Sequence, residues 1–243
     1  MINVWTIARR EFKHYFVSPL AYAIAFLIFV VLGVIFYANL SLGYASQQPP
    51  DPTAPLGPLV TIYLFAVPAV TMRLLADEQR MGTIELLLTA PLRDWELVVG
   101  KWLGALLFNL VILAGTLIYP FIVNSMTDPG IDQGTVLATY LGLTLLLSAM
   151  LAIGVFFSSL FSNQFAAFFV TLGGLLLLWI VAFPVQNASG PLADVLRYLQ
   201  LSDHYFNNLY RGVIDTTDLL YFLSLTALFL FLGTRMLETR RWR

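Results

Sequence analysis

Six long apolar runs constrain this chain more than any other feature of its sequence. Each run is close to the length of about 20 residues with which an α-helix crosses roughly 30 Å of hydrocarbon. Hydrophobic residues make up 59% of the chain and charged residues only 11%, which leaves too little polar sequence to cover a globular surface. The runs are residues 20–42, 56–75, 102–126, 135–161, 165–185 and 219–237.

These runs predict an all-α, polytopic membrane protein with six transmembrane helices in one domain over residues 1–243. Inside a bilayer the backbone must satisfy its own hydrogen bonds, and long runs without polar alternation are typical of helices rather than barrel strands. The first eighteen residues carry charges throughout, and the apolar run after them is longer than a signal core. We therefore expect the first span to be retained.

The basic residues predict the orientation of the spans. Six spans place both termini on one side, and Lys and Arg concentrate on the cytoplasmic side. Eleven of the thirteen basic residues flank the spans on a single face, and only Arg197 and Arg211 fall on the other. We expect a multi-pass protein of the cytoplasmic (inner) membrane with both termini in the cytoplasm. The eleven are Arg9, Arg10, Lys13, Arg73, Arg80, Arg93, Lys101, Arg235, Arg240, Arg241 and Arg243.

The sequence offers no recognisable catalytic, cofactor or metal site. It contains no cysteine, and its two histidines, His14 and His204, fall on opposite faces of the expected topology, so they cannot share a metal ion. The single Gly-Lys pair, Gly100-Lys101, lacks the rest of a phosphate-binding loop. The spans are nearly free of ionisable groups; Arg73 lies near a span end, where its side chain can reach the interface. We expect a chain that is no enzyme and binds no nucleic acid.

The first eighteen residues form an amphipathic segment that Pro19 separates from the first span. On a helical wheel, aromatic and small residues share one arc while charged residues, Glu11 included, take the other. Such a helix is expected to lie flat on the cytoplasmic leaflet. The apolar arc holds Val4, Trp5, Ala8, Phe12, Tyr15 and Phe16, and the polar arc Arg10, Glu11, Lys13 and His14.

The outer side is expected to carry one long loop, residues 187–218. Its residues Leu192, Val195, Leu196 and Leu199 recur at helical spacing opposite Asp194, Arg197 and Gln200. This pattern predicts a short amphipathic helix that lies at the outer interface or re-enters the membrane beside span five.

A charged, helix-forming segment separates the second and third apolar runs. Gly82 loosens its start and Pro91 enforces its end, since glycine is conformationally free and proline lacks a backbone N–H. Ile84, Leu87 and Leu88 form an apolar stripe on this water-facing segment, and an amphipathic helix must bury such a stripe. Lipid head groups and a partner protein would bury it equally well.

Several motifs resemble those of type-2 ABC exporter permeases. The segment Glu78-Gln-Arg-Met-Gly-Thr-Ile-Glu-Leu-Leu-Leu-Thr-Ala-Pro91 is similar to their cytoplasmic coupling helix, and residues 8–19 are similar to their elbow helix. Ser158-Ser-Leu-Phe-Ser-Asn-Gln164, between spans four and five, also resembles this family. Residues 201–206, 211–215 and 221–223 are similar to the gliding-motility (GldF-like) branch.

The resemblance implies a half-transporter that pairs with a second copy and sits on a separate ATPase subunit, which binds ATP and Mg. It also leaves room for an auxiliary extracytoplasmic subunit beside the lipid bilayer. The implied coupling residues are Glu78, Gly82, Thr83, Ile84, Glu85, Leu87, Leu88 and Pro91, and the implied elbow residues Arg9, Arg10, Glu11, Phe12 and Phe16.

Two other functions remain open from the sequence. One is a membrane anchor or scaffold of a multiprotein assembly, for example in motility or cofactor maturation, through which nothing crosses. The other is an ATP-independent carrier, which the nearly charge-free spans disfavour because no proton or ion relay is visible. The cargo cannot be deduced, since Asn109, Asn124 and Tyr140 suit either an amphiphile or plain helix packing.

Overall fold

The structure is a computed structural model that describes residues 2–47, 50–82, 92–185 and 188–241. Within these residues all regular secondary structure is helical, and there is no strand. Six helical stretches are long and apolar enough to cross a membrane, which confirms the predicted all-α class with six spans. They are Pro19–Ser46, Leu56–Arg80, Asp94–Met126, Gln133–Leu160, Gln164–Val185 and Thr216–Thr239.

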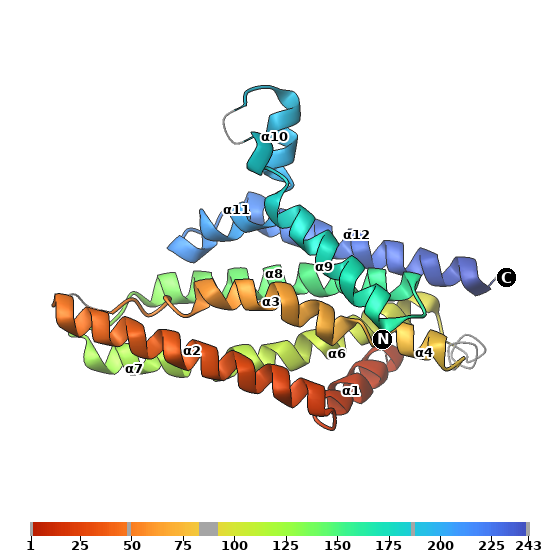
Figure 1. Cartoon of the computed structure of the whole chain (residues 1–243), viewed down its shortest axis with the longest axis horizontal. Coiled ribbons are helices and arrows are strands. Elements are labelled where there is room, and N and C mark those ends of the chain that lie inside the picture. Colours follow the sequence, from red (N-terminus) through yellow and green to blue (C-terminus); the bar gives the residue numbers. More distant parts are fainter. Residues whose placement is uncertain (1, 48–49, 83–91, 186–187, 242–243) are drawn as a thin grey trace.

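The long helices lie side by side in a bundle whose long axis is horizontal in Figure 1. The N-terminus, α4 and the C-terminus lie toward its right-hand end, whereas α2 and α7 end at the left. The helices are α1 (Ile2–Tyr15), α2 (Pro19–Ser46), α3 (Leu56–Thr71), α4 (Ala76–Arg80), α6 (Asp94–Gly115), α7 (Ile118–Met126), α8 (Gln133–Leu160), α9 (Gln164–Ile180), α10 (Pro191–Tyr198), α11 (Leu201–Phe206) and α12 (Thr216–Arg241), with 3-10 turns η1 (Phe183–Val185) and η2 (Leu209–Arg211).

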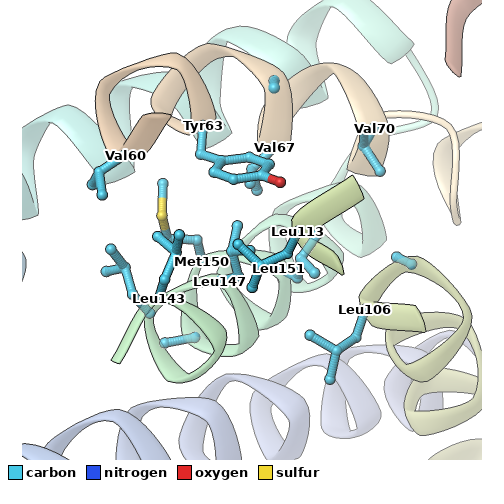
Figure 2. Packing of buried hydrophobic residues seen from close by; sticks show 14 of the residues in the cluster. Val60, Tyr63, Val67, Val70, Leu106, Leu113, Leu143, Leu147, Met150 and Leu151 are labelled. Atoms are coloured by element: carbon cyan, nitrogen blue, oxygen red, sulfur yellow. The ribbon is translucent and has the colours of Figure 1, made fainter. Parts of the chain in front are cut away.

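Helix α8 is the centre of the bundle, because it packs against α3, α6, α9 and α12. Figure 2 shows side chains of α3 meeting side chains of α8 and α6 in this core. On α3 the contact residues recur at helical spacing, from Val60 and Tyr63 to Val67 and Val70, and all four are buried. At the crossing of α3 and α8, Gly154 lets the Thr71 side chain approach the α8 backbone directly.

Local sequence signals explain where several helices begin. Pro19 is the first residue of α2, a position at which its missing N–H costs no hydrogen bond. The Asn163 side chain caps α9 by accepting a hydrogen bond from Phe165 N–H at 2.9 Å. Asp132 caps α8 in the same way, and hydrogen bonds from Thr135 and from the Gly134 backbone lower the pKa of its carboxyl.

Three predicted spans differ from the helices in the structure. The predicted span 56–75 lies within the stretch Leu56–Arg80, in which α3 ends at Thr71 and a turn leads into α4. Span three begins earlier than residue 102, since α6 starts at Asp94, and it breaks before α7. The run 165–185 holds α9 to Ile180 and then η1. A hydropathy window misses such ends: Asp94 and Glu96 favour a helix start but are charged.

The predicted outer loop contains more structure than one amphipathic helix. Helix α10 carries the predicted apolar stripe and stands apart from the bundle at the end of α9 (Figure 1). After it, α11 and η2 return and pack against α8, where Leu209 lies directly on Gly142. Gln200, which the wheel placed on the polar face, is buried and donates hydrogen bonds to Ser202 and Asp203.

Candidate functional site

Helix α1 packs directly on the backbone of α6. A Cβ atom at Gly100 would lie 2.7 Å from the Cβ of Ile7, and one at Gly104 would lie 2.6 Å from the Cβ of Glu11. Only a residue without a side chain allows an approach this close. Two glycines one turn apart on α6 therefore hold the middle of α1. At the end of α1, Tyr15 stacks on Phe108 with 4.7 Å between the ring centroids.

This packing corrects the predicted place of Glu11 on α1. Glu11 was expected on the water-facing arc, but its side chain is only 17% exposed and points to Lys101 of α6. Trp5 and Phe16, expected on the apolar arc that faces the leaflet, are 57% and 40% exposed on the protein. The helical wheel was wrong here because it sorts residues by polarity, whereas α1 presents Glu11 to a buried cation.

Lys101 joins three elements through one ammonium group. Its Nζ lies 3.3 Å from Glu11 Oε2 on α1 and 2.9 Å from Glu78 Oε1 on α4. The three side chains are 6%, 17% and 13% exposed, in the order Lys101, Glu11 and Glu78. Charge pairs this poorly solvated interact far more strongly than surface pairs. We call Glu11, Lys101 and Glu78 the charge triad.

The other side of α4 is held by the corner between α8 and α9. Ser158 Oγ accepts hydrogen bonds from the backbone N–H groups of Leu75 at 3.1 Å and Ala76 at 3.2 Å. The Gln79 side chain donates to the Ser159 carbonyl at 2.8 Å, and the Gln164 side chain donates to Asp77. We call these contacts, together with the charge triad, the α4 junction.

Three segments singled out in the sequence thus meet at one place. The elbow segment supplies Glu11, the coupling segment supplies Glu78, and the segment 158–164 supplies the residues that hold α4. A cavity of about 510 Å³ lies beside the charge triad between α1, α2, α3, α4 and α6. Arg73, expected to snorkel, lines this cavity with its side chain exposed.

The remaining predicted site residues fall into two groups. Gly82 follows α4 with a φ of +69°, a left-handed conformation that favours glycine at the end of a helix. Arg9 and Arg10 are exposed and Phe12 is half-buried, so they lie outside the charge triad. The other coupling residues lie outside the described residues: they are Thr83, Ile84, Glu85, Leu87, Leu88 and Pro91.

A second polar cluster, at the opposite end of the bundle, was not predicted. His204 Nδ1 lies 2.6 Å from Asp218 Oδ1, and Asn208 donates to the other Asp218 oxygen at 2.8 Å. The His204 ring stacks on Tyr221 at 3.9 Å, and the Tyr221 hydroxyl donates to the Leu199 carbonyl. Asp218 is only 2% exposed, and we call this group the His204 cluster.

Sequence reasoning also missed the partners inside the α4 junction. Glu11, Glu78 and Lys101 were each noted, but nothing in the sequence pairs Lys101 with Glu11, 90 positions before it, or with Glu78, 23 positions before it. One signal was available: a lysine and a glutamate at the edges of apolar segments need counter-charges when those segments fold together. Ser158 carried a weaker signal, as one of two adjacent serines at the end of an apolar run.

Comparison with known proteins gives a family match over nearly the whole chain. The model of a family described as ABC-2 family transporter protein matches residues 5–242. No curated protein matches the chain. The match spans the elbow segment, the α4 junction and the last helix, so it concerns the whole bundle. With six membrane-spanning stretches and a family match of this extent, the chain belongs to the ABC-2 transporter family of multi-pass membrane proteins.

Proposed function

We propose that this chain is the permease subunit of an ATP-driven exporter or mechanotransmission complex, and that a separate ATPase subunit, which binds ATP and Mg, drives it through the segment 78–91. The observation that carries the proposal is the charge triad. Glu78 stands at the root of that segment and shares Lys101 with Glu11 of the elbow helix. A displacement of α4 is therefore resisted by α1 and α6 together.

The α4 junction supports a mechanical role for this end of the bundle. On one side α4 is tied to α1 and α6 through charges, and on the other to the α8–α9 corner through Ser158, Ser159 and Gln164. Since α8 is the central helix, a push on α4 reaches the core by a short path. The spans and α4 would have two conformations, and the ATPase would bind ATP in only one of them. ATP binding would then shift the population of the spans toward that conformation.

The orientation follows from the basic residues. Both termini and the segment 78–91 lie on the cytoplasmic side of the inner membrane, because eleven of the thirteen basic residues flank the spans on that side. The chain lacks native cysteine, so single cysteines can be labelled with an impermeant maleimide in intact cells. We expect cysteines at Gln48 and Gln133 to label from outside, and those at Glu85, Ser162 and Arg241 to stay unlabelled. External labelling at Glu85 contradicts the orientation.

One copy supplies six spans, which are too few to enclose a path for a large cargo, so we propose a symmetric dimer with one ATPase per permease. The export direction and the gliding-motility branch rest on the motif resemblance alone. Native mass spectrometry of the purified complex gives the stoichiometry. One permease per two ATPases would contradict the dimer.

The coupling role is tested by changing the segment 78–91 itself. Glu85→Arg replaces an attraction by a repulsion at the ATPase contact, and Leu88→Asp forces a carboxylate into the docked apolar stripe. Both variants are expected to insert normally but to lose ATPase co-purification or turnover in nanodiscs. Gln48→Arg, in the outer loop, is the matched control and should behave as wild type. Wild-type binding and turnover by both coupling variants would favour the membrane scaffold instead.

A further inference from the structure

A groove of about 500 Å³ runs between α1 and α6 on the face of α1 away from the α4 junction. Trp5 and Phe12 of α1 form one wall of the groove. Leu107 and Leu110 of α6, both half-buried, belong to the other. The groove is distinct from the cavity beside the charge triad, because the two share no lining residue.

The charges of this groove are all positive. Arg9 and Lys13 line it, and both side chains are exposed. They are four residues apart on α1 and so lie on the same face of that helix, one turn apart. No described acidic residue lines the groove, and neither cation is in a salt bridge with any residue of the described ranges. The groove therefore presents two unneutralised cations at its rim.

The cavity on the other face of α1 provides a contrast. Arg10 lines that cavity, where Glu11, Asp77 and Glu78 also contribute carboxylates. Its cations thus share their space with acids, whereas Arg9 and Lys13 do not. Neighbouring residues of one helix face two environments that differ in charge, and only one of them favours an anion.

The floor of the groove is apolar and follows α6 into the membrane. Leu107, Leu110, Val111 and Ala114 recur at helical spacing and form a stripe roughly 10 Å long, at 1.5 Å per residue. Val111 is 47% exposed and Ala114 is exposed too, so the described part of the chain leaves these two residues of the stripe uncovered. The charged helix α1 must stay at the membrane surface, while this part of α6 belongs to a span.

We propose that the α1–α6 groove binds a phospholipid with a net negative head group. The head-group phosphate lies against Arg9 and Lys13, and an acyl chain lies along the α6 stripe. Trp5 and Phe12 line the groove, and aromatic side chains favour the boundary between head groups and hydrocarbon. We place this boundary at the level of these two residues. Charge complementarity selects an anionic lipid over a zwitterionic one, since each Lys or Arg near the surface attracts an anionic lipid.

Lipid retention by the purified, full-length protein tests the site. The protein is incubated with equal amounts of phosphatidylglycerol and phosphatidylcholine in detergent, and bound lipid is counted by native mass spectrometry. Wild type should retain phosphatidylglycerol roughly tenfold more than phosphatidylcholine. Arg9→Gln/Lys13→Gln should lower phosphatidylglycerol to the level of phosphatidylcholine. Arg10→Gln, which removes a cation from the other face of α1, should retain it as wild type does.

A second variant tests the acyl-chain part of the site without changing any charge. Ala114→Phe fills the lower groove and should reduce phosphatidylglycerol retention several-fold, while millimolar inorganic phosphate should not displace the lipid from wild type. Equal retention of the two lipids by wild type, or wild-type retention by Arg9→Gln/Lys13→Gln and Ala114→Phe, would overturn the proposal. Disulfide formation between two copies carrying Val111→Cys would also overturn it, because a second copy would then cover the groove.

Discussion

The two ends of the bundle are both closed by polar groups, but they join different parts of the chain. At the α4 junction, the Glu78–Lys101 pair spans 23 positions. The other ion pair and the hydrogen bonds connect residues 80 to 90 positions apart, such as Gln79 with Ser159 and Glu11 with Lys101. In the His204 cluster the partners are 10 to 22 positions apart. The first end ties separate helices to one another, whereas the second folds one segment onto itself. A displacement at the α4 junction must therefore reach several helices, whereas a displacement at the His204 cluster can stay within its own segment.

The largest effect is expected from removing the cation of the charge triad. Lys101→Met leaves Glu11 and Glu78 facing each other with little solvent, and breaking a buried pair in this way costs about 3 to 5 kcal/mol of unfolding free energy. Thermal unfolding in detergent, followed by tryptophan fluorescence, measures the loss. If the triad transmits motion, ATP turnover by the complex that contains this variant should also no longer differ from turnover by the ATPase subunit alone.

Two further variants make this test specific. Adding Glu11→Gln and Glu78→Gln to Lys101→Met removes the repulsion and should restore most of the stability. Arg235→Met breaks an exposed pair with Glu238 and should cost less than about 1 kcal/mol. Equal losses for Lys101→Met and Arg235→Met would mean that the triad contributes no more than a surface pair.

The next effect comes from the close approach of α1 to α6. Gly104→Leu places a side chain where Glu11 and the Ala8 carbonyl already lie, so α1 must move away and the charge triad must open. Overpacking of this kind costs about 1 to 3 kcal/mol. Gly173→Leu is the matched control, since no other group lies within 4 Å of a Cβ at that position of α9. A stable Gly104→Leu protein with normal turnover would contradict the described packing of α1.

A smaller effect is expected at the α8–α9 corner. Ser158→Ala removes the acceptor of the Leu75 and Ala76 N–H groups, and an unsatisfied buried donor costs about 1 to 2 kcal/mol. The neighbouring Ser159→Ala loses only a bond within α8, to the Phe156 carbonyl, and serves as the control. Hydrogen exchange at residues 75–80 should rise in Ser158→Ala alone. Unchanged exchange there would show that the corner does not hold α4.

The smallest effect, and the one that separates the two ends, is expected at the His204 cluster. Asp218→Asn keeps the size of a buried side chain but removes the charge that strengthens its bonds to His204 and Asn208, for a loss of about 1 kcal/mol. Asp194→Asn, in an exposed ion pair with Arg197, is the control. Coupling to the ATPase should persist in both. Loss of coupling in Asp218→Asn would mean that the two ends are not independent.

The sequence predicts the number and class of the spans well, because a bilayer imposes length and apolarity on each span separately. It predicts helix ends less well: α6 begins at Asp94, among charged residues that a hydropathy window rejects, and the second span is interrupted after Thr71. Those ends depend on capping and on neighbouring helices. The apolarity and length of a span can be deduced from its own sequence, whereas a helix end that depends on a neighbouring helix cannot.

The candidate site shows the same limit. Glu78 and Gly82 were chosen from a motif, and the structure describes both. The motif does not indicate that Glu78 shares Lys101 with Glu11. The polarity of Glu11 even predicted the wrong surroundings for this residue, since a helical wheel treats every charge as solvated. A buried counter-charge supplied by another helix reverses that assignment. Only the three-dimensional packing brings these residues together.

Helices α2 and α8 have the same length and similar apolar composition, but their positions in the bundle make them differ in their tolerance to substitution. Most side chains of α2 are at least partly exposed, with Ala21, Ile28, Leu32 and Phe36 the buried exceptions, so its surroundings require little beyond solubility in hydrocarbon. Central α8 must match the shapes of four long helices and of α11 and η2. In a saturation library, exchanges among Leu, Ile, Val and Phe should survive along α2 and be lost along α8. Hydropathy alone would score the two helices as equally tolerant.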